Sequence, residues 1–248
     1  MARRATAPGP GERRSTDYAY RRIREQIISG KIPAGTVLSQ AALAEELGVS
    51  RTPLREATRL MQNEGLLVGE RNQQLRVASI SLTDLDQLYA IRIASETMAL
   101  RLAVPQMDDA HKARIGEALG AMDAIAAGDG AGDFDRHHRE FHRLLVVPAG
   151  ERFEALSQTL WDHTIRYRSA YLSAAEDLED AVAAAGREHR GIEAAVTAGD
   201  ANGAASALAD HYARTARAIF AAADPDHGAP AMESAISAAG AGAYQRKT

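Results

Sequence analysis

The chain has 248 residues, of which 46% are hydrophobic and 25% are charged, and its formal net charge is −4. This is the composition of a folded globular protein, so a collagen-like or intrinsically disordered chain is excluded. Cysteine is absent, which excludes a disulfide framework, a thiolate zinc site, an iron–sulfur cluster and a cysteine nucleophile. No apolar run reaches the roughly 18 residues needed to cross a bilayer, and no apolar stretch follows the basic first 16 residues as in a secretory signal. We therefore expect a cytoplasmic protein without a membrane partner.

Charge is divided unevenly along the chain. Residues 1–80 contain 13 Lys and Arg against 8 Asp and Glu, whereas residues 81–248 contain 16 against 25. The composition changes at the same place, because the chain after Ile80 is rich in alanine and has long stretches without proline. The pattern indicates two domains, a basic one that could meet a polyanion and an acidic one that is nearly all helix. Charge alone leaves open that the difference between the two regions is only chance variation in the number of charged surface residues.

The basic region begins with a Pro-, Gly- and Arg-rich tail over 1–16, which is expected to be disordered. Apolar residues at helical spacing then predict a helix from about residue 17 that ends at Gly30. A second helix is predicted over 39–47 and a third over 50–63, with Gly48 in the turn between them and Ser50 as amino-terminal cap. Two short strands, 66–68 and 75–77, flank a polar turn. This order predicts a winged helix-turn-helix over 17–78.

The third helix of this domain carries basic and polar residues at its start and on its outer face, and its buried face is predicted to contain Leu54, Ala57, Leu60 and Met61. The candidate DNA contacts on this helix are Arg51, Thr52, Arg55 and Arg59. The free N–H groups of a helix amino terminus and the planar guanidinium of arginine suit phosphates and base edges in the major groove. In the hairpin, the candidates for the neighbouring minor groove are Arg71 and Asn72, together with Gln73 and Arg76. The alternative is a small helical domain with a solvated charged face.

The segment from Tyr20 to Val77 contains IPAGTVLSQAALAEELGVSRTPLREATRLMQNEGLL. It closely resembles the DNA-binding domain of GntR-type transcription regulators. The resemblance implies that Arg51, Thr52 and Arg55 are the contacts of the recognition helix and that the wing approaches the minor groove. This chain has Gln73-Gln74 where the family wing usually has a glycine, a departure that concerns the wing contacts.

In the second region, apolar residues at helical spacing predict six helices, which are separated by breaks rich in Gly and Asp. These helices are expected over 82–104, 109–127, 132–147, 151–173, 178–198 and 201–222. In the first of them Leu85, Leu88, Ile91 and Ala99 recur at helical spacing. Such a pattern suits an antiparallel bundle, in which ligands bind between facing helices. The expected protein is thus mainly α, with a helical second domain over 79–223 and a flexible tail over 224–248.

Six of the eight histidines lie between residues 137 and 211. His138 and His142 are four residues apart, so they share one helix face and can share an ion. His189 and His211 each lie about ten residues from the predicted turn at Gly199-Asp200, which places them at one height if their helices are antiparallel. The spacing permits a metal site, but it leaves open that each histidine is an ordinary residue with a satisfied hydrogen bond.

Three segments of this region, YAIRIASETMALRLA, HREFHRLL and IEAAVTAGDANGAASALADHY, resemble the ligand-sensing FCD-type helical domain of the FadR-like branch of GntR regulators. The resemblance implies a divalent ion held by an Asp and three His, here His142, His189 and His211, with His138 at the position of the family Asp. Asp135, one turn earlier on the same face, or a water is the alternative to His138. Nitrogen donors favour zinc, nickel or another transition ion. The family effector is commonly a small organic acid, for which Arg92 is the candidate partner. The alternative is that Arg92 only pairs with Glu96 four residues later.

Together these features predict a homodimeric transcription regulator, and not an enzyme, that binds an inverted repeat in operator DNA and responds to a carboxylate at the metal. A metal-dependent hydrolase is the first alternative. Glu140 is two residues after His138, about 200° around the helix, so it cannot serve as the base beside the ion. Phosphate-loop, dinucleotide and nucleophile-elbow motifs are absent from the sequence. A helical interaction protein without effector sensing is the second alternative, and the metal content would distinguish it.

Overall fold

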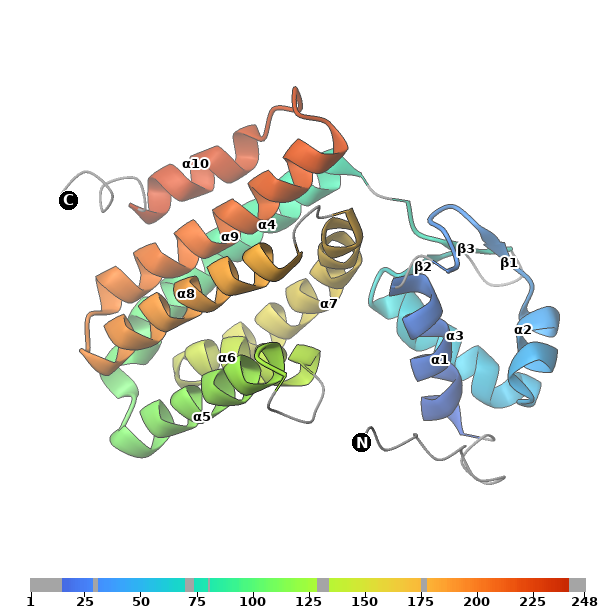
Figure 1. The fold of residues 1–248 in the computed structure, drawn as a ribbon, viewed down its shortest axis with the longest axis horizontal. Helices are drawn as coiled ribbons and strands as arrows, with labels where there is room; N and C mark the ends of the chain where they lie inside the picture. The colour runs from blue at the N-terminus through green and yellow to red at the C-terminus, as the bar shows by residue number, and fades with distance from the viewer. Residues whose placement is uncertain are drawn as a thin grey trace. The chain divides into compact units, whose positions relative to one another are not determined.

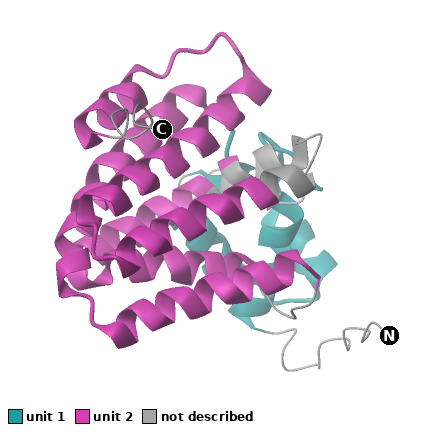
Figure 2. Cartoon of the chain, turned by 60° about the vertical axis from the view of Figure 1, so that its left-hand side comes forward, with its two compact units in different colours: residues 1–80 teal, residues 81–248 magenta. Residues whose placement is uncertain are grey.

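The computed structural model describes residues 15–28, 31–69, 74–79, 81–128, 134–174 and 178–240. The chain forms two compact units, residues 1–80 and 81–248 (Figure 2). Each unit has its own buried core, and each is described separately below.

The first unit is a winged helix-turn-helix made of α1 (Thr16–Ile28), α2 (Gln40–Leu47), α3 (Arg51–Asn63) and a small sheet. The sheet has the order β1-β3-β2, with antiparallel pairs between β1 (Val37–Leu38), β3 (Leu75–Val77) and β2 (Leu67–Val68). Ile23, Leu54 and Met61 lie at the centre of its core. The three predicted helices and both hairpin strands are confirmed, whereas the sequence analysis missed β1. Two residues of strand carry no periodicity that could reveal them.

The turn between α2 and α3 sets the position of α3. Ser39 caps α2, because its hydroxyl accepts a hydrogen bond from the N–H of Ala42, and Gly48 ends the helix in the left-handed region at φ +65°. Ser50 stands at the predicted cap position of α3, but its side chain makes no capping hydrogen bond. Leu60 was expected in the core and is instead 42% exposed, since the buried stripe of α3 runs along Leu54, Ala57, Thr58 and Met61.

The second unit is a bundle whose long helices follow one another through short connections (Figure 1). Its helices are α4 (Leu82–Ala103), α5 (Asp109–Ala126), α6 (Phe134–Val146), α7 (Glu151–Ala174), α8 (Leu178–Thr197), α9 (Ala201–Ala223) and α10 (Pro230–Ala239). Helix α4 packs against α7, α9 and α10 and supplies much of the core. Ile91 on α4 recurs at helical spacing with the buried Leu85 and Leu88, but it is 51% exposed. Within the described ranges, none of the helices combines the length and the apolar character that a membrane span requires.

Helix α10 corrects the expectation of a flexible tail over 224–248 for the part from Pro230 to Ala239. Its Met232 is fully buried, and α4 contacts both of its ends. The carboxylate of Asp86 accepts hydrogen bonds from the N–H groups of Ala231 (3.1 Å) and Met232 (2.8 Å), and Arg101 Nη2 donates to the carbonyl of Ala239 (2.6 Å). The two charges match the positive and negative ends of the helix dipole. A ten-residue helix whose large apolar side chains are Met232 and Ile236 is too short for periodicity to predict, since its stability comes from these contacts.

Candidate nucleic-acid interface and metal centre

The amino terminus of α3 forms one wall of a surface hollow of about 430 Å³, which is lined by Gln40, Ala41, Arg51, Thr52, Leu54 and Arg55. Arg51, Thr52 and Arg55 are exposed, because the opposite face of α3 is buried in the core. Three of the predicted DNA contacts therefore lie together. Gln40 was not singled out in the sequence. Its position as the first residue of α2, directly after the Ser39 cap, places it beside them.

The remaining predicted contacts lie elsewhere. Arg59 is exposed two turns further along α3 and forms an ion pair with Glu56 (Nε to Oε2 3.5 Å). Arg71, Asn72 and Gln73 lie outside the described residues. Near the wing, Arg76 Nη1 donates a hydrogen bond to the carbonyl of Gly35 (2.7 Å), which joins strand β3 to the turn before β1.

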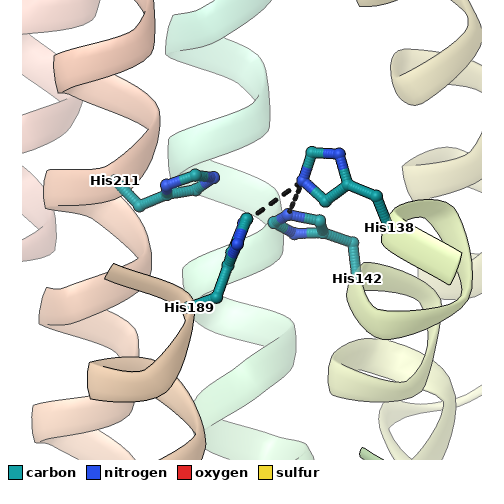
Figure 3. Close-up of side chains that lie close together, drawn as sticks. All are labelled: His138, His142, His189 and His211. Atoms are coloured by element: carbon teal, nitrogen blue, oxygen red, sulfur yellow. Dashed lines mark hydrogen bonds between the residues drawn. The ribbon is translucent and has the colours of Figure 1, made fainter. Parts of the chain in front are cut away.

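The four predicted histidine ligands converge inside the second unit (Figure 3). His138 and His142 project from α6, His189 from α8 and His211 from α9, and all four are buried. Each offers one nitrogen, and these four nitrogens lie within 4.8 Å of one another. The rings of His189 and His211 are 4.5 Å apart, as expected if α8 and α9 run back from the turn at Gly199, whose φ is +72°.

The donor set fits a metal ion. His138 Nε2 lies 3.1 Å from His142 Nε2 and 3.2 Å from His189 Nε2. A ring nitrogen carries at most one proton, so His138 Nε2 cannot donate a full hydrogen bond to both neighbours. A Zn–N distance of about 2.0–2.1 Å implies nitrogen atoms about 3.3 Å apart around a tetrahedral ion, close to the separations seen here. Asp135, one turn before His138, is not part of the group.

The outer nitrogens of two histidines have polar partners. His211 Nδ1 lies 2.7 Å from Glu188 Oε2, and Glu188 Oε1 pairs with Arg214 Nε (3.0 Å). His142 Nδ1 lies 3.0 Å from the hydroxyl of Tyr212. Burial raises the pKa of Glu188, and the nearby Arg214 and Arg187 oppose this shift. Burial also raises the pKa of Tyr212, so this hydroxyl stays protonated at neutral pH. Sequence reasoning missed both partners, because neither belongs to a metal-ligand pattern.

Arg92 is 2% exposed and lies beside this site. Its Nε donates to Glu96 Oε1 (2.9 Å), and its guanidinium carbon is 4.1 Å from the centre of the Tyr212 ring. Burial by itself lowers the pKa of Arg92, but Glu96 and the neighbouring tyrosines outweigh it, so the pKa is raised and the side chain keeps its charge. Among the described residues, Arg92 Nη2 has no hydrogen-bond partner. The pairing with Glu96 is thus present, and an effector role for Arg92 stays a prediction.

Glu140 faces away from the histidines, as its position on the helix predicts. Its carboxylate pairs with Arg143 (Oε2 to Nε 2.8 Å) and with Arg114 (Oε1 to Nη2 3.4 Å). The hydrogen bond from Arg143 lowers the pKa of Glu140. This carboxylate is engaged on the surface of α6 and is not placed to act as a base beside the cluster.

A winged helix-turn-helix with arginines at the start of its third helix, joined to a helical bundle, defines a DNA-binding regulator of transcription. Comparison with known proteins agrees. Residues 16–77 match the model of the bacterial regulatory proteins of the gntR family, and residues 87–214 match the FCD domain. The chain belongs to the GntR family and carries an FCD domain; it is a transcription regulator and not an enzyme.

Two curated relatives and one solved structure illustrate the likeness. The chain is 32% identical over 191 residues to the probable D-xylose utilization operon transcriptional repressor of Paenarthrobacter nicotinovorans, covering 76% of this chain and 81% of that protein. It is 31% identical over 128 residues to the uncharacterized HTH-type transcriptional regulator YdhC of Bacillus subtilis, covering 51% of this chain and 57% of that protein. The structure of E. coli McbR/YncC, with 23% identity and a TM-score of 0.66, covers 83% of this chain and 96% of that chain and supports the fold.

Proposed function

We propose that a small carboxylate controls operator binding by this regulator, and that it binds at a divalent transition metal held by His138, His142, His189 and His211. The observation that carries this proposal is the convergence of four buried imidazoles from three helices. Burying a polar ring costs free energy unless the ring is hydrogen-bonded or binds a metal. A cluster of four buried imidazoles would therefore destabilise the fold if it served only to fill the core. Uncharged nitrogen donors favour zinc or nickel over magnesium or calcium. A bound ion would supply open coordination positions for a carboxylate.

Arg92 is the group that we expect to receive the effector. Its charged guanidinium is buried. Its Nε is bonded to Glu96, whereas its Nη2 has no hydrogen-bond partner among the described residues and could donate to a ligand. A charge-assisted hydrogen bond between this nitrogen and a carboxylate oxygen would satisfy a buried donor that otherwise costs free energy. The same Arg92 connects through Glu96 and Tyr212 to His142, so the anion and the ion would bind within one polar network.

For the DNA complex, we propose that Arg51, Thr52 and Arg55 contact the major groove and that Gln40, which lines the same hollow from α2, contacts it as well. Arginine can bridge guanine, and glutamine can bridge adenine, each through two hydrogen bonds. Arg59 would contact phosphates and the wing residues the minor groove. One such module supplies little affinity, so we propose that a homodimer binds an inverted repeat in the cytoplasm.

The effector can change operator binding only if it binds one arrangement of the helices more tightly than another. The histidines belong to α6, α8 and α9, so an ion held by all four would fix the relative positions of three helices. A carboxylate that joins the ion and Arg92 would extend this constraint to α4, the helix that directly follows residue 80.

Two substitutions test the proposal, because one should affect only DNA binding and the other only the metal content. Arg55→Ala should weaken specific DNA binding by about 1–3 kcal/mol, a factor of about 5–150, and leave the metal content unchanged. His189→Ala should lose the metal and keep binding to DNA in the absence of effector. Arg22→Ala on α1 and His163→Ala on α7 are the matched controls, since neither lies in the proposed sites. Equal loss of both properties in one variant would indicate unfolding.

A thermal-shift screen of the natively purified protein with zinc, nickel and small organic acids completes the test. A compound that binds the folded state raises its melting temperature. Metal in the purified protein, or a rise with metal that increases further with an acid, supports the proposal. A protein that holds no metal and responds to neither would favour the helical interaction protein without effector sensing.

A further inference from the structure

In two of the four histidines, His142 and His211, the ring nitrogen Nδ1 contacts a polar group outside the histidine cluster. His211 Nδ1 lies 2.7 Å from Glu188 Oε2, and His142 Nδ1 lies 3.0 Å from the Tyr212 hydroxyl. The Nε2 atom of His142 faces the cluster, where it lies 3.1 Å from His138 Nε2. The protons in these outer contacts determine which ring nitrogen is left with a lone pair.

The proton count at His142 follows from the hydrogen bonds of Tyr212. This hydroxyl has one proton, which it donates to Glu96 Oε2 (2.7 Å). The carboxylate of Glu96 also accepts from Arg92 Nε (2.9 Å) and from Ser157 Oγ (3.1 Å), so it acts only as an acceptor. The Tyr212 oxygen must therefore accept from His142, which requires a proton on Nδ1. In a neutral imidazole the other nitrogen, Nε2, is then an acceptor with a lone pair.

The same reasoning applies to His211 with one step fewer. An ionised carboxylate can only accept hydrogen bonds, so Glu188 Oε2 accepts a hydrogen bond from His211 Nδ1–H, and in a neutral imidazole Nε2 then carries the lone pair. Arg214 Nε holds the second oxygen of Glu188 at 3.0 Å and fixes the direction of the carboxylate. The two histidines are thus oriented by separate carboxylates, one directly and one through a tyrosine.

We propose that Glu188, and Glu96 acting through Tyr212, are positioning residues that hold His211 and His142 in the Nδ1–H form, with both Nε2 lone pairs directed into the cluster before a metal ion binds. The inference rests on the proposed metal site. A ligand that already has the required tautomer and orientation loses less freedom on binding, and outer partners of this kind typically change metal affinity by about 10–100-fold.

The first measurement is made on the metal-free full chain with ¹⁵N-labelled histidine. Ring nitrogen chemical shifts distinguish the two tautomers, and the tautomers can be read in a sample that contains no metal. We expect Nδ1–H for His142 and His211, and a shift of His142 alone towards Nε2–H in Tyr212→Phe. An Nε2–H form for either residue in the unaltered protein would overturn the inference.

The second measurement is zinc affinity by competition with a chelating indicator. Tyr212→Phe and Glu188→Met should each weaken zinc binding by about 10–100-fold, whereas Glu188→Gln, which keeps an acceptor oxygen, should recover most of the loss. Tyr167→Phe is the matched control. It removes a buried hydroxyl whose described partners are Ser81 and Asp84, far in sequence from the histidines.

The outcomes separate the two proposals. Zinc affinity that is equally weak in Tyr167→Phe and Tyr212→Phe, or unchanged in Tyr212→Phe and Glu188→Met, would overturn the positioning role. A protein whose spectra show both Nδ1–H forms but which binds neither zinc nor nickel would support the hydrogen-bond assignment and refute the proposed metal-dependent function alone.

Discussion

Replacing Asp86 by alanine tests whether α10 is held to the bundle by charge-assisted hydrogen bonds. Asp86 is 6% exposed, and its carboxylate accepts from two backbone N–H groups at the start of α10. A hydrogen bond to a charged group contributes about 1.5–3 kcal/mol, and loss of a helix cap costs about 0.5–2 kcal/mol. Because one carboxylate makes both bonds, we expect Asp86→Ala to lower the free energy of unfolding by about 2–3 kcal/mol, not by the sum.

The effect is measurable in two ways. The second unit spans residues 81–248, and for a domain of this size about 1 kcal/mol lowers the melting temperature by roughly 2–4 °C, so we expect a decrease of roughly 4–12 °C. Amide hydrogen exchange should increase first in Pro230–Ala239, because Met232 loses its docked position. Glu117→Ala on the exposed face of α5 is the charge-matched control. If Asp86→Ala were no less stable than this control, the reasoning about α10 would be refuted.

Three further predictions concern buried charge, pH and backbone conformation. Arg92→Met leaves Glu96 buried without its cation and should cost about 3–5 kcal/mol in urea unfolding, most of which Arg92→Met with Glu96→Gln should restore; a loss below about 1 kcal/mol would contradict it. Glu140→Gln should cost less than about 1 kcal/mol at neutral pH, since the ion pair is partly exposed. The pKa of Glu140 is lowered in the folded protein, so its contribution is complete above the ordinary Glu value of about 4.3 and disappears as the pH falls through the lowered value; a difference that does not change with pH would refute this assignment. Gly48→Ala should destabilise by about 1–2 kcal/mol because φ is +65°, whereas Gly120→Ala, in the interior of α5, should stabilise by about 0.5–1 kcal/mol; the same sign for both, measured by thermal unfolding, would contradict the backbone argument.

Local sequence patterns determined the DNA-binding unit and most helices of this protein. The third helix was predicted over 50–63 and spans Arg51–Asn63, because a cap residue, a first-turn proline and an apolar stripe all act within a few residues of one another. Glycines in the left-handed region, such as Gly48 and Gly199, end helices for the same local reason. The histidine spacing permitted these four side chains to meet, since helix rise converts sequence distance from a turn into height, and the resemblance to the FCD domain singled them out as ligands.

Tertiary structure alone decided the features that depend on residues far apart in the chain. Asp86 and Met232 are 146 positions apart in the chain, yet the hydrogen bond between them holds α10 in place. The sequence had led us to expect a flexible tail in this segment. Periodicity placed Leu60 in the core, but a helix face is buried only where another element covers it, and this side chain is exposed. The partners of the histidine rings, Glu188 and Tyr212, could not be predicted from the sequence either. Side-chain directions, and therefore the hydrogen bonds between side chains, are set only when the helices pack.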